Sequence, residues 1–336
     1  MRNRFILLIV SFSFIYTQAQ DTRYAAEFLE LGVSTKALGM GGANVSLNND
    51  VTGASWNPAS IAFIPQLQAA SLYANLFNSL EKQSYVGAAI PLFGGTTVSF
   101  SWIRLSIDGI DRHSFDPGGF TFRDRYYDED LWLTRAPEGS FGSSDNAYYI
   151  SFAKHMDINW DIGWQYWEMP LEMAFGFNIK MIDLSLDNKS GSGVGIDLGY
   201  ILKLGLDKIF VSPYYGDLSI GISTQDMLNT RITWDTDSKH KDNIARNFKI
   251  GFSYSQPLPV FKSSLTLAYD LDTRYNGLEH VGLEYLFNNL FAVRIGSNGG
   301  YMTTGAGIYL WKLKVEYAFQ SHDLGNTHRV GILFGL

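Results

Sequence analysis

The sequence predicts an all-β protein, a transmembrane antiparallel β-barrel of about 14 strands with an N-terminal hatch segment in its lumen. Bulky apolar residues alternate with small or charged residues in tracts of about ten residues from Leu67 onward. Aromatic residues make up 15% of the 336 residues, and 33 Gly stand against 9 Pro, a composition that favours a single sheet-rich body. The chain has no Cys, so hydrogen bonding and packing alone must hold it together.

The first residues have the pattern of an export signal. Arg2 and Arg4 precede an apolar run from Phe5 to Tyr16, which is followed by the small-x-small site at Thr17–Ala19. That run is too short for a spanning helix. We therefore expect residues 1–19 to be a signal peptide and the chain to reach the outer membrane of a Gram-negative bacterium.

The strands follow from the period-two alternation. In "LTLAYDLD", Leu265, Leu267 and Tyr269 would face one side, while Asp270 and Asp272 face the other. Residues 67–336 are predicted to form the barrel, with the apolar face of each strand turned outward toward lipid. Closure of the sheet would leave no unpaired backbone edge in the membrane. The expected strands are 67–77, 83–91, 95–105, 146–156, 171–184, 192–204, 217–226, 246–256, 263–272, 279–287, 290–297, 302–310, 311–320 and 327–336.

The connections separate into two groups, as expected for short periplasmic turns and longer outer loops. The long outer loops would be 106–145 and 227–245, and the tight periplasmic turns Asn288–Asn289 and Leu310–Trp311. Two predicted periplasmic connections, 157–170 and 205–216, are long. The first contains Trp160 and is interpreted as an interfacial aromatic segment, with a partner-binding surface as the alternative.

One hairpin can be paired from sequence alone. If Phe287 and Phe291 both face lipid across a three-residue turn, Glu284 lies opposite Arg294 inside the barrel. The same parity predicts a lumen charge network, which either fills the interior structurally or lines a conduction path. Its members are Asp270, Glu284, Arg294, Lys312, Lys314, Glu316 and Arg329.

Residues 20–66 do not alternate like the rest of the chain. They contain the glycines Gly39, Gly41 and Gly42, and the motif formed by Asn57, Pro58 and Ala59. A dinucleotide-binding loop would need a helix after the glycines, and Asn, Asp and Ser follow instead. We expect a plug or hatch in the lumen, in which Pro58 fixes a turn and the Asn57 amide caps backbone groups.

The stretch "STKALGMGGANVSLNNDVTGASWNPASIAF" resembles the N-terminal signature of the PorV/PorQ family of Bacteroidota outer-membrane proteins, which are distant relatives of FadL channels. The stretches "HVGLEYLFNNLFAVRIGSNGG" and "TTGAGIYLWKLKVEYAFQSHDLGNTHRVGILFGL" are similar to the last strands of that family. The resemblance covers both ends of the expected mature chain. It implies a fourteen-stranded barrel whose hatch is anchored by the motif at Asn57, Pro58 and Ala59.

Three functions remain open. The PorV/PorQ resemblance implies a role in type IX protein secretion or surface attachment of cargo. The alternative is a FadL-like passive channel for hydrophobic small molecules, in which the hatch moves. A third interpretation is a structural barrel whose lumen stays filled.

No enzyme, cofactor or metal site is predicted, because the six His have no metal-ligand spacing and there is no Cys. Without Arg2 and Arg4, 24 basic residues stand against 33 acidic ones, a balance that disfavours nucleic acid and anionic headgroups as partners. Expected partners are outer-membrane lipid, type IX translocon or cargo proteins, and a hydrophobic ligand. In the 106–145 loop, an aromatic set would act as a lid or a protein contact: Phe115, Phe120, Tyr126, Tyr127 and Trp132.

Overall fold

The computed structural model describes residues 26–47, 50–113, 122–127, 137–161, 168–274 and 277–336. The expected signal peptide at residues 1–19 lies outside the described residues, as do Phe115, Phe120 and Trp132. Within the described part of the chain, no helix is long and apolar enough to cross a membrane.

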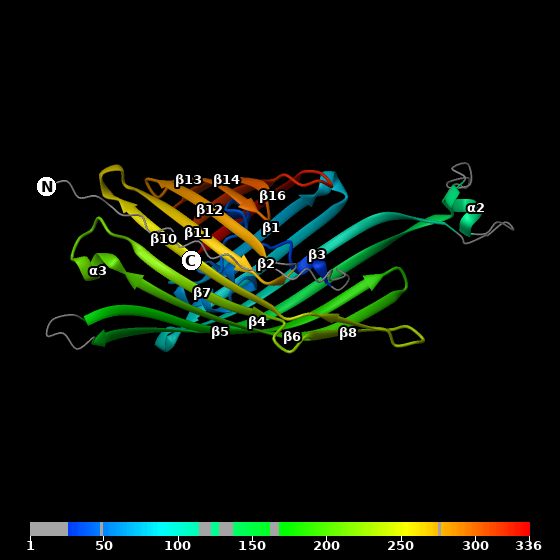
Figure 1. Ribbon diagram of the computed structural model, residues 1–336, viewed down its shortest axis with the longest axis horizontal. Coiled ribbons are helices and arrows are strands. Elements are labelled where there is room, and N and C mark those ends of the chain that lie inside the picture. The colour runs from blue at the N-terminus through cyan, green and yellow to red at the C-terminus, as the bar shows by residue number, and fades with distance from the viewer. Residues whose placement is uncertain (1–25, 48–49, 114–121, 128–136, 162–167, 275–276) are drawn as a thin grey trace.

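Antiparallel strands make up the body of the protein (Figure 1). They are β1 (Gln68–Leu76), β2 (Glu81–Leu92), β3 (Thr96–Arg112), β4 (Gly139–Asp161), β5 (Glu168–Leu186), β6 (Lys189–Gly205), β7 (Asp217–Gln225), β8 (Thr230–Trp234), β9 (Lys241–Ile244), β10 (Asn247–Leu258), β11 (Ser263–Asp272), β12 (Leu278–Phe287), β13 (Phe291–Asn298), β14 (Tyr301–Leu310), β15 (Leu313–Gln320) and β16 (Thr327–Gly335).

The sheet closes on itself. Each strand from β10 to β16 pairs with the next, β16 pairs with β1, β1 to β6 continue the series, and β7 joins β6 to β10. The short strands β8 and β9 continue β7 and β10 beyond breaks at 226–229 and 245–246, and β8 pairs with the far half of β6. In the described part of the chain, the 16 strand segments therefore form a closed barrel of 14 wall strands, so the predicted antiparallel β-barrel of about 14 strands is confirmed.

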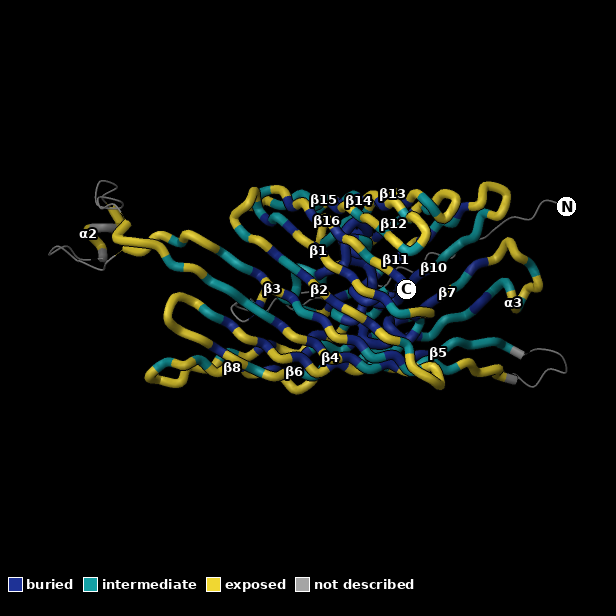
Figure 2. Tube along the Cα trace, turned by 180° about the vertical axis from the view of Figure 1, so that it is seen from behind, coloured by how far each residue is buried: buried dark blue, intermediate teal, exposed yellow. Residues whose placement is uncertain are grey.

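The alternation of side chains explains the barrel. Inward positions are small or polar and buried, such as Ala70, Ala74 and Ser99, whereas outward positions are large and apolar, such as Phe100 and Ile150. Figure 2 shows buried and exposed residues alternating along the strands in the middle of the barrel, with mostly exposed residues at its two ends. An apolar exterior around a closed hydrogen-bonded wall is what a bilayer requires.

Each of the fourteen predicted strands is present, but three predicted loops contain additional strand. The two ends of 106–145, residues 106–112 and 139–145, belong to β3 and β4, which remain paired out to Arg112 and Gly139. The 227–245 loop contains β8 and β9, and residues 157–161 and 168–170 belong to β4 and β5. Alternation weakens where strands leave the bilayer, because both faces then meet water; sequence periodicity therefore misses these extensions.

The helical elements lie in the lumen and in the connections. They are η1 (Glu27–Leu29), α1 (Thr35–Gly39), η2 (Val51–Ser55), η3 (Pro58–Phe63), η4 (Phe77–Ser79), η5 (Phe93–Gly95), α2 (Phe122–Tyr127), α3 (Leu206–Phe210) and η7 (Pro259–Phe261). At one end, the β3–β4 hairpin extends beyond the other strands and carries α2 (Figure 1). We call this the outer end, because longer loops lie outside. The opposite, inner end has the predicted tight turns, with Asn288, Asn289 and Trp311 in the left-handed region.

Candidate functional site in the barrel lumen

The described part of residues 26–66, here called the luminal segment, lies inside the barrel (Figure 1). Its helix α1 contacts β13, β14, β15 and β16, whereas η3 contacts β3, β4, β5 and β6 on another side of the wall. Many of its residues are completely buried, among them Ala37, Met40, Val51, Ala59 and Ile61. This segment thus packs into the middle of the lumen against two sides of the wall.

The predicted motif anchors the segment to β5, β6 and β7. The Asn57 side chain is fully buried and caps η3 by accepting from the Ala59 N–H at 3.0 Å. Its Nδ2 donates to the Val45 carbonyl at 2.8 Å and to the Tyr200 carbonyl of β6 at 3.2 Å. Asn57 therefore satisfies backbone groups of both the segment and the wall, in addition to the cap that was expected from sequence.

The wall is thin where this motif packs. Gly176 of β5 and Gly199 of β6 are directly paired and face inward. A Cβ on Gly176 would lie 2.3 Å from the Pro58 carbonyl carbon, and one on Gly199 would lie 1.9 Å from Asn57 Oδ1. Only glycine allows such close approach of two backbones.

The three predicted glycines occupy the opposite contact. Gly39 packs against the backbone of Gly305, with a would-be Cβ 3.1 Å from its Cα. Gly41 and Gly42 have φ of +71° and +82°, and the Gly41 N–H donates to Thr303 Oγ1 at 2.9 Å. These residues let the segment turn while it lies flat on β12–β14.

Two predicted lumen charges hold the backbone of the luminal segment. Asp270 Oδ2 accepts from the Asn44 N–H at 2.5 Å and from the Val45 N–H at 2.8 Å. The Arg329 guanidinium, 3% exposed, donates to the carbonyls of Leu31 at 2.6 Å and Gly32 at 3.1 Å. The carboxylate accepts from buried backbone N–H groups, and the guanidinium donates to backbone carbonyls. Both are charge-assisted hydrogen bonds, which are stronger than those between neutral groups.

Three other predicted charges form one cluster. Arg294 Nε donates to Glu284 Oε2 at 2.6 Å, and its Nη2 donates to Glu316 Oε1 at 2.8 Å and to the Tyr309 hydroxyl. Lys36 of α1 lies 3.4 Å from Glu284. The predicted register, with Glu284 opposite Arg294 and Phe287 opposite Phe291, is the one observed.

Two predicted network members make no ion pair with this cluster in the described part of the chain. Lys314 faces inward, but its Nζ lies over the Tyr309 ring at 5.0 Å. Lys312 lies in the turn between β14 and β15, where its Nζ stacks over the exposed Trp311 ring at 5.0 Å. Its placement in the lumen was wrong, because the strand ends at Leu310 and the parity does not continue through the turn.

A second charge cluster was missed in the sequence. Lys180 Nζ lies 2.9 Å from Asp197 and 2.8 Å from Asp226, and all three are buried. Arg274 joins Asp226 to Glu30 of the luminal segment, and Lys249 pairs with Asp272 at 2.9 Å. Extending the alternation of inward and outward positions along β5 and β6 would have placed Lys180 and Asp197 in the lumen. Asp226 lies at the break after β7, with φ +52°, where parity gives no guidance.

An outer cavity of about 860 Å³ lies between the luminal segment and the outer strand ends. One wall is apolar and includes Leu105, Leu184 and Trp234, with Phe28 and Trp56 of the segment below. The other wall is polar and includes Lys249, Asp272, His280 and Arg329. Such a mixed lining suits a largely apolar molecule with a small polar part.

A second depression, of about 460 Å³, lies on the lipid-facing surface of β4–β6. Its rim includes Phe152, Phe175, Phe177 and Leu198, with Gly176 and Gly199 at its base. The Phe152 and Phe177 rings stack with centroids 5.1 Å apart. The depression therefore lies outside the thin part of the wall that the Asn57 motif covers from inside.

The described residues contain one His and carboxylate group close enough to share a metal ion, namely His155, Asp157 and Glu172 near the inner end. Glu172 already pairs with Lys203 at 3.5 Å and Lys208 at 3.3 Å. Two ammonium groups on the central carboxylate favour an ion-pair network over a cation site.

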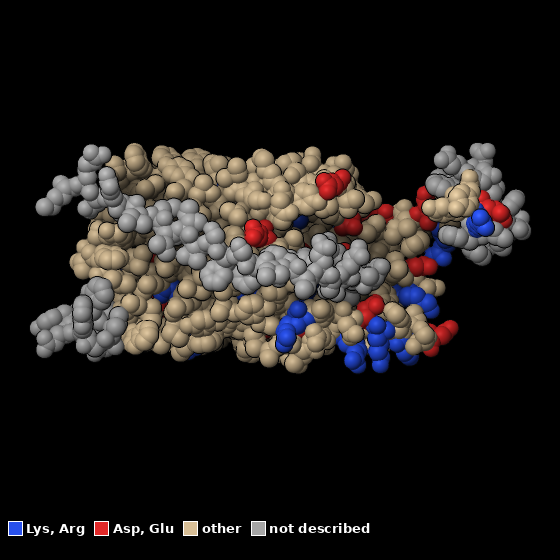
Figure 3. All heavy atoms as spheres, in the orientation of Figure 1, with Lys and Arg blue, Asp and Glu red and all other residues tan. Residues whose placement is uncertain are grey.

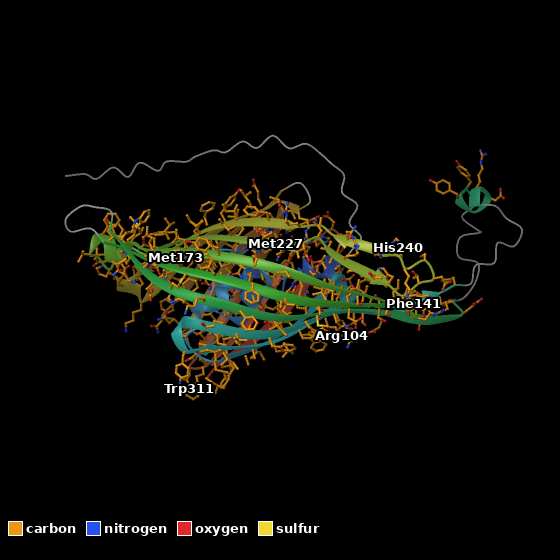
Figure 4. All side chains as sticks on the ribbon, turned by 90° about the horizontal axis from the view of Figure 1, so that it is seen from below. Arg104, Phe141, Met173, Met227, His240 and Trp311 are labelled. Atoms are coloured by element: carbon orange, nitrogen blue, oxygen red, sulfur yellow. The ribbon has the colours of Figure 1, made fainter. Side chains whose placement is uncertain are left out.

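Of the predicted lid or partner residues, the structure places Tyr126 and Tyr127 in α2, where they are 61% and 75% exposed. In Figure 4, Arg104, Phe141 and His240 lie toward the outer end, while Met173 and Trp311 lie toward the inner end. Figure 1 places α2, and with it the two tyrosines, at the end of the β3–β4 hairpin and away from the barrel body, so these two residues do not cover the outer cavity.

Searches against protein families and against characterised proteins find no match to this chain. Among solved structures, it is similar to the toluene transporter TodX of Pseudomonas putida (10% identity, TM-score 0.46, covering 90% of this chain and 96% of TodX). It is also similar to a FadL homologue of Pseudomonas aeruginosa (9% identity, TM-score 0.47, 90% and 98%) and to the monoaromatic hydrocarbon channel CymD (8% identity, TM-score 0.39, 91% and 98%). The similarity concerns the barrel fold; the PorV/PorQ resemblance stays a prediction.

Proposed function

We propose that this chain is an outer-membrane channel for hydrophobic small molecules, which bind in the outer cavity before they pass the luminal segment. The observation that carries the proposal is the 860 Å³ cavity with an apolar wall at Leu105, Leu184 and Trp234. A barrel that served only as a filled structural body would have no need of such a space. Its volume lies in the range of ligand pockets.

Passage would require the luminal segment to move. Hydrogen bonds attach the segment to the wall at Asn57, Asp270 and Arg329, and each such contact contributes about 1–3 kcal/mol. Contacts of that size can be exchanged as a ligand arrives, which suits a passive gate. The PorV/PorQ resemblance favoured the secretion role, and this proposal takes the FadL-like alternative in its place.

The experiment is binding of N-phenylnaphthylamine, an apolar fluorescent probe, to the purified barrel. We expect saturable binding that Leu184→Trp weakens at least tenfold, because the inward indole fills the cavity. The matched control is Met181→Trp, which adds the same ring to the outward face of β5, where Met181 is 59% exposed. Absence of saturable binding, or equal affinity in both variants, would contradict the proposal.

A second candidate is the handling of exported proteins, as the PorV/PorQ resemblance implies. The observation in its favour is the β3–β4 hairpin, which projects beyond the barrel and carries Tyr126 and Tyr127 (Figure 1). Exposed tyrosines are typical of protein contacts. The test is affinity isolation from gently solubilised membranes with a tag at Asn188, read by mass spectrometry. Recovery of secretion or cargo proteins, lost with Tyr126→Ser and Tyr127→Ser, would favour this role, and isolation of the barrel alone would oppose it.

A further inference from the structure

We infer that the outward face of β8 and β9 binds the phosphate groups of a glycolipid in the outer leaflet of the membrane. The residues that carry this inference are Arg231, Lys241 and Arg246, here called the outer cationic patch. The inference rests on the membrane-spanning fold and does not depend on passage of hydrophobic molecules.

The direction of the two strand residues follows from their pairing. Ile232 of β8 is fully buried and points inward, so its neighbour Arg231 points outward, and Arg231 is exposed. Arg231 pairs with Asn243, and Lys241 pairs with Thr233, so Arg231 and Lys241 share the outward face as diagonal neighbours. Diagonal side chains in such a sheet lie about 7–8 Å apart at the backbone, which allows two long side chains to reach one phosphate.

The patch lies where the apolar exterior ends. On β6 the outward residues run from Leu198 to Val194, 61% exposed, and then change to Ser192. Register places Val194 beside Arg231, because Gly193 pairs with Ile232. On β10 the exposed outward residues Phe252 and Phe248 are followed by the exposed Arg246 at the break. Beside β6 and at the end of β10, the cations come directly after the last lipid-facing side chains. They therefore lie at the depth of the lipid headgroups.

These cations are uncompensated. In the described part of the chain, the side chains of Arg231, Lys241 and Arg246 make no ion pair. Asp242, which is next to Lys241 in sequence, accepts from Trp234 Nε1 at 2.6 Å and lies 3.1 Å from His240 Nε2, so it is already engaged. Asp235 pairs with Lys239 at 3.5 Å. A partner with negative charge would therefore gain contacts without displacing existing ones.

The positive charge is also localised. The chain as a whole has a formal charge of −7, yet Lys and Arg side chains gather over the β8 end of the barrel (Figure 3). On strands β11–β16 the only Lys and Arg are Arg294, Lys314 and Arg329, and all three point into the lumen. Net charge therefore gives no indication of this patch, whereas strands β11–β16 carry no outward-facing Lys or Arg.

The test is a native mass spectrometry titration of the full-length barrel in detergent with diphosphoryl lipid A. We expect Arg231→Gln/Lys241→Gln to bind roughly tenfold more weakly than the unmodified protein, since each cation near an anionic lipid surface contributes measurably to binding. The control with the same loss of charge is Lys154→Gln/Lys262→Gln, two exposed lysines at the inner end, and we expect it to keep full affinity.

A second titration with dephosphorylated lipid A separates phosphate recognition from acyl-chain contact. We expect the unmodified protein and the Arg231/Lys241 variant to bind that lipid equally. The inference would be overturned if the inner-end control lost as much affinity for lipid A as the Arg231/Lys241 variant, or if that variant lost none. It would also be overturned if the difference in affinity persisted with dephosphorylated lipid A. Binding of inorganic phosphate with the same affinity as the lipid would likewise overturn it.

Discussion

Asn57 Oδ1 lies where a β-carbon of Gly199 would be, 1.9 Å from that ideal position. The two residues come from the luminal segment and from β6, and their contact holds the segment against the wall. The absence of a side chain at Gly199 is therefore what allows the Asn57 amide to reach the Tyr200 carbonyl at 3.2 Å.

Gly199→Ala is expected to displace the motif, since the new methyl group would collide with Asn57 and its hydrogen bonds would lengthen. We expect a loss of about 1–3 kcal/mol of barrel stability. The chain has no Cys, so Ala59→Cys provides a single thiol at a fully buried position. Its maleimide labelling rate should rise at least tenfold when Gly199→Ala is added. Gly139→Ala, which meets no atom within 4 Å, is the matched control, and equal labelling in both backgrounds would refute this account of the contact.

Asp270 provides a second test of how the luminal segment is held. Asp270→Ala leaves the buried N–H groups of Asn44 and Val45 without their acceptor, at about 1–3 kcal/mol each. Hydrogen exchange read by mass spectrometry should accelerate in the peptide that contains residues 44 and 45. Asp270→Asn retains an acceptor oxygen and should accelerate it less. If both variants exchange at the rate of the unmodified protein, the segment is held elsewhere.

The wall was predictable from sequence to a much greater extent than the lumen. Alternation gives every wall strand, and the short turn after Phe287 is enough to pair Glu284 with Arg294. The contact between Asn44 and Asp270 joins residues 226 positions apart, and no local pattern records which strand an irregular segment will touch. Lys312 shows where alternation fails as a predictor. It lies in the turn between β14 and β15, where side chains no longer alternate between the lumen and the exterior. The cavity was likewise unpredictable, since its walls come from strands far apart in the chain.

Two inward lysines should differ sharply in their effect on stability. Lys180 contacts Asp197 and Asp226 and is 2% exposed, so Lys180→Met would leave two carboxylates facing each other and should cost about 3–5 kcal/mol. Within the described residues Lys314 makes no ion pair and lies over the Tyr309 ring at 5.0 Å, so Lys314→Met should cost about 1 kcal/mol. The measurement is the temperature at which each barrel loses its folded mobility in a detergent gel. Equal midpoints would show that the Lys180 cluster does not stabilise the fold.

Arg294 allows the charge and the packing of the second cluster to be separated. Its guanidinium is fully buried between Glu284 and Glu316. Arg294→Met would take this cation from both carboxylates, although Glu284 keeps Lys36 at 3.4 Å, and it should destabilise the barrel by about 3–5 kcal/mol. Adding Glu284→Gln and Glu316→Gln removes those charges, and the triple variant should recover most of the loss. Urea unfolding in lipid vesicles, followed by tryptophan fluorescence, gives the free energies of unfolding. If the triple variant is as unstable as Arg294→Met, the guanidinium acts by filling space between β12 and β15, and the ion pairs contribute little.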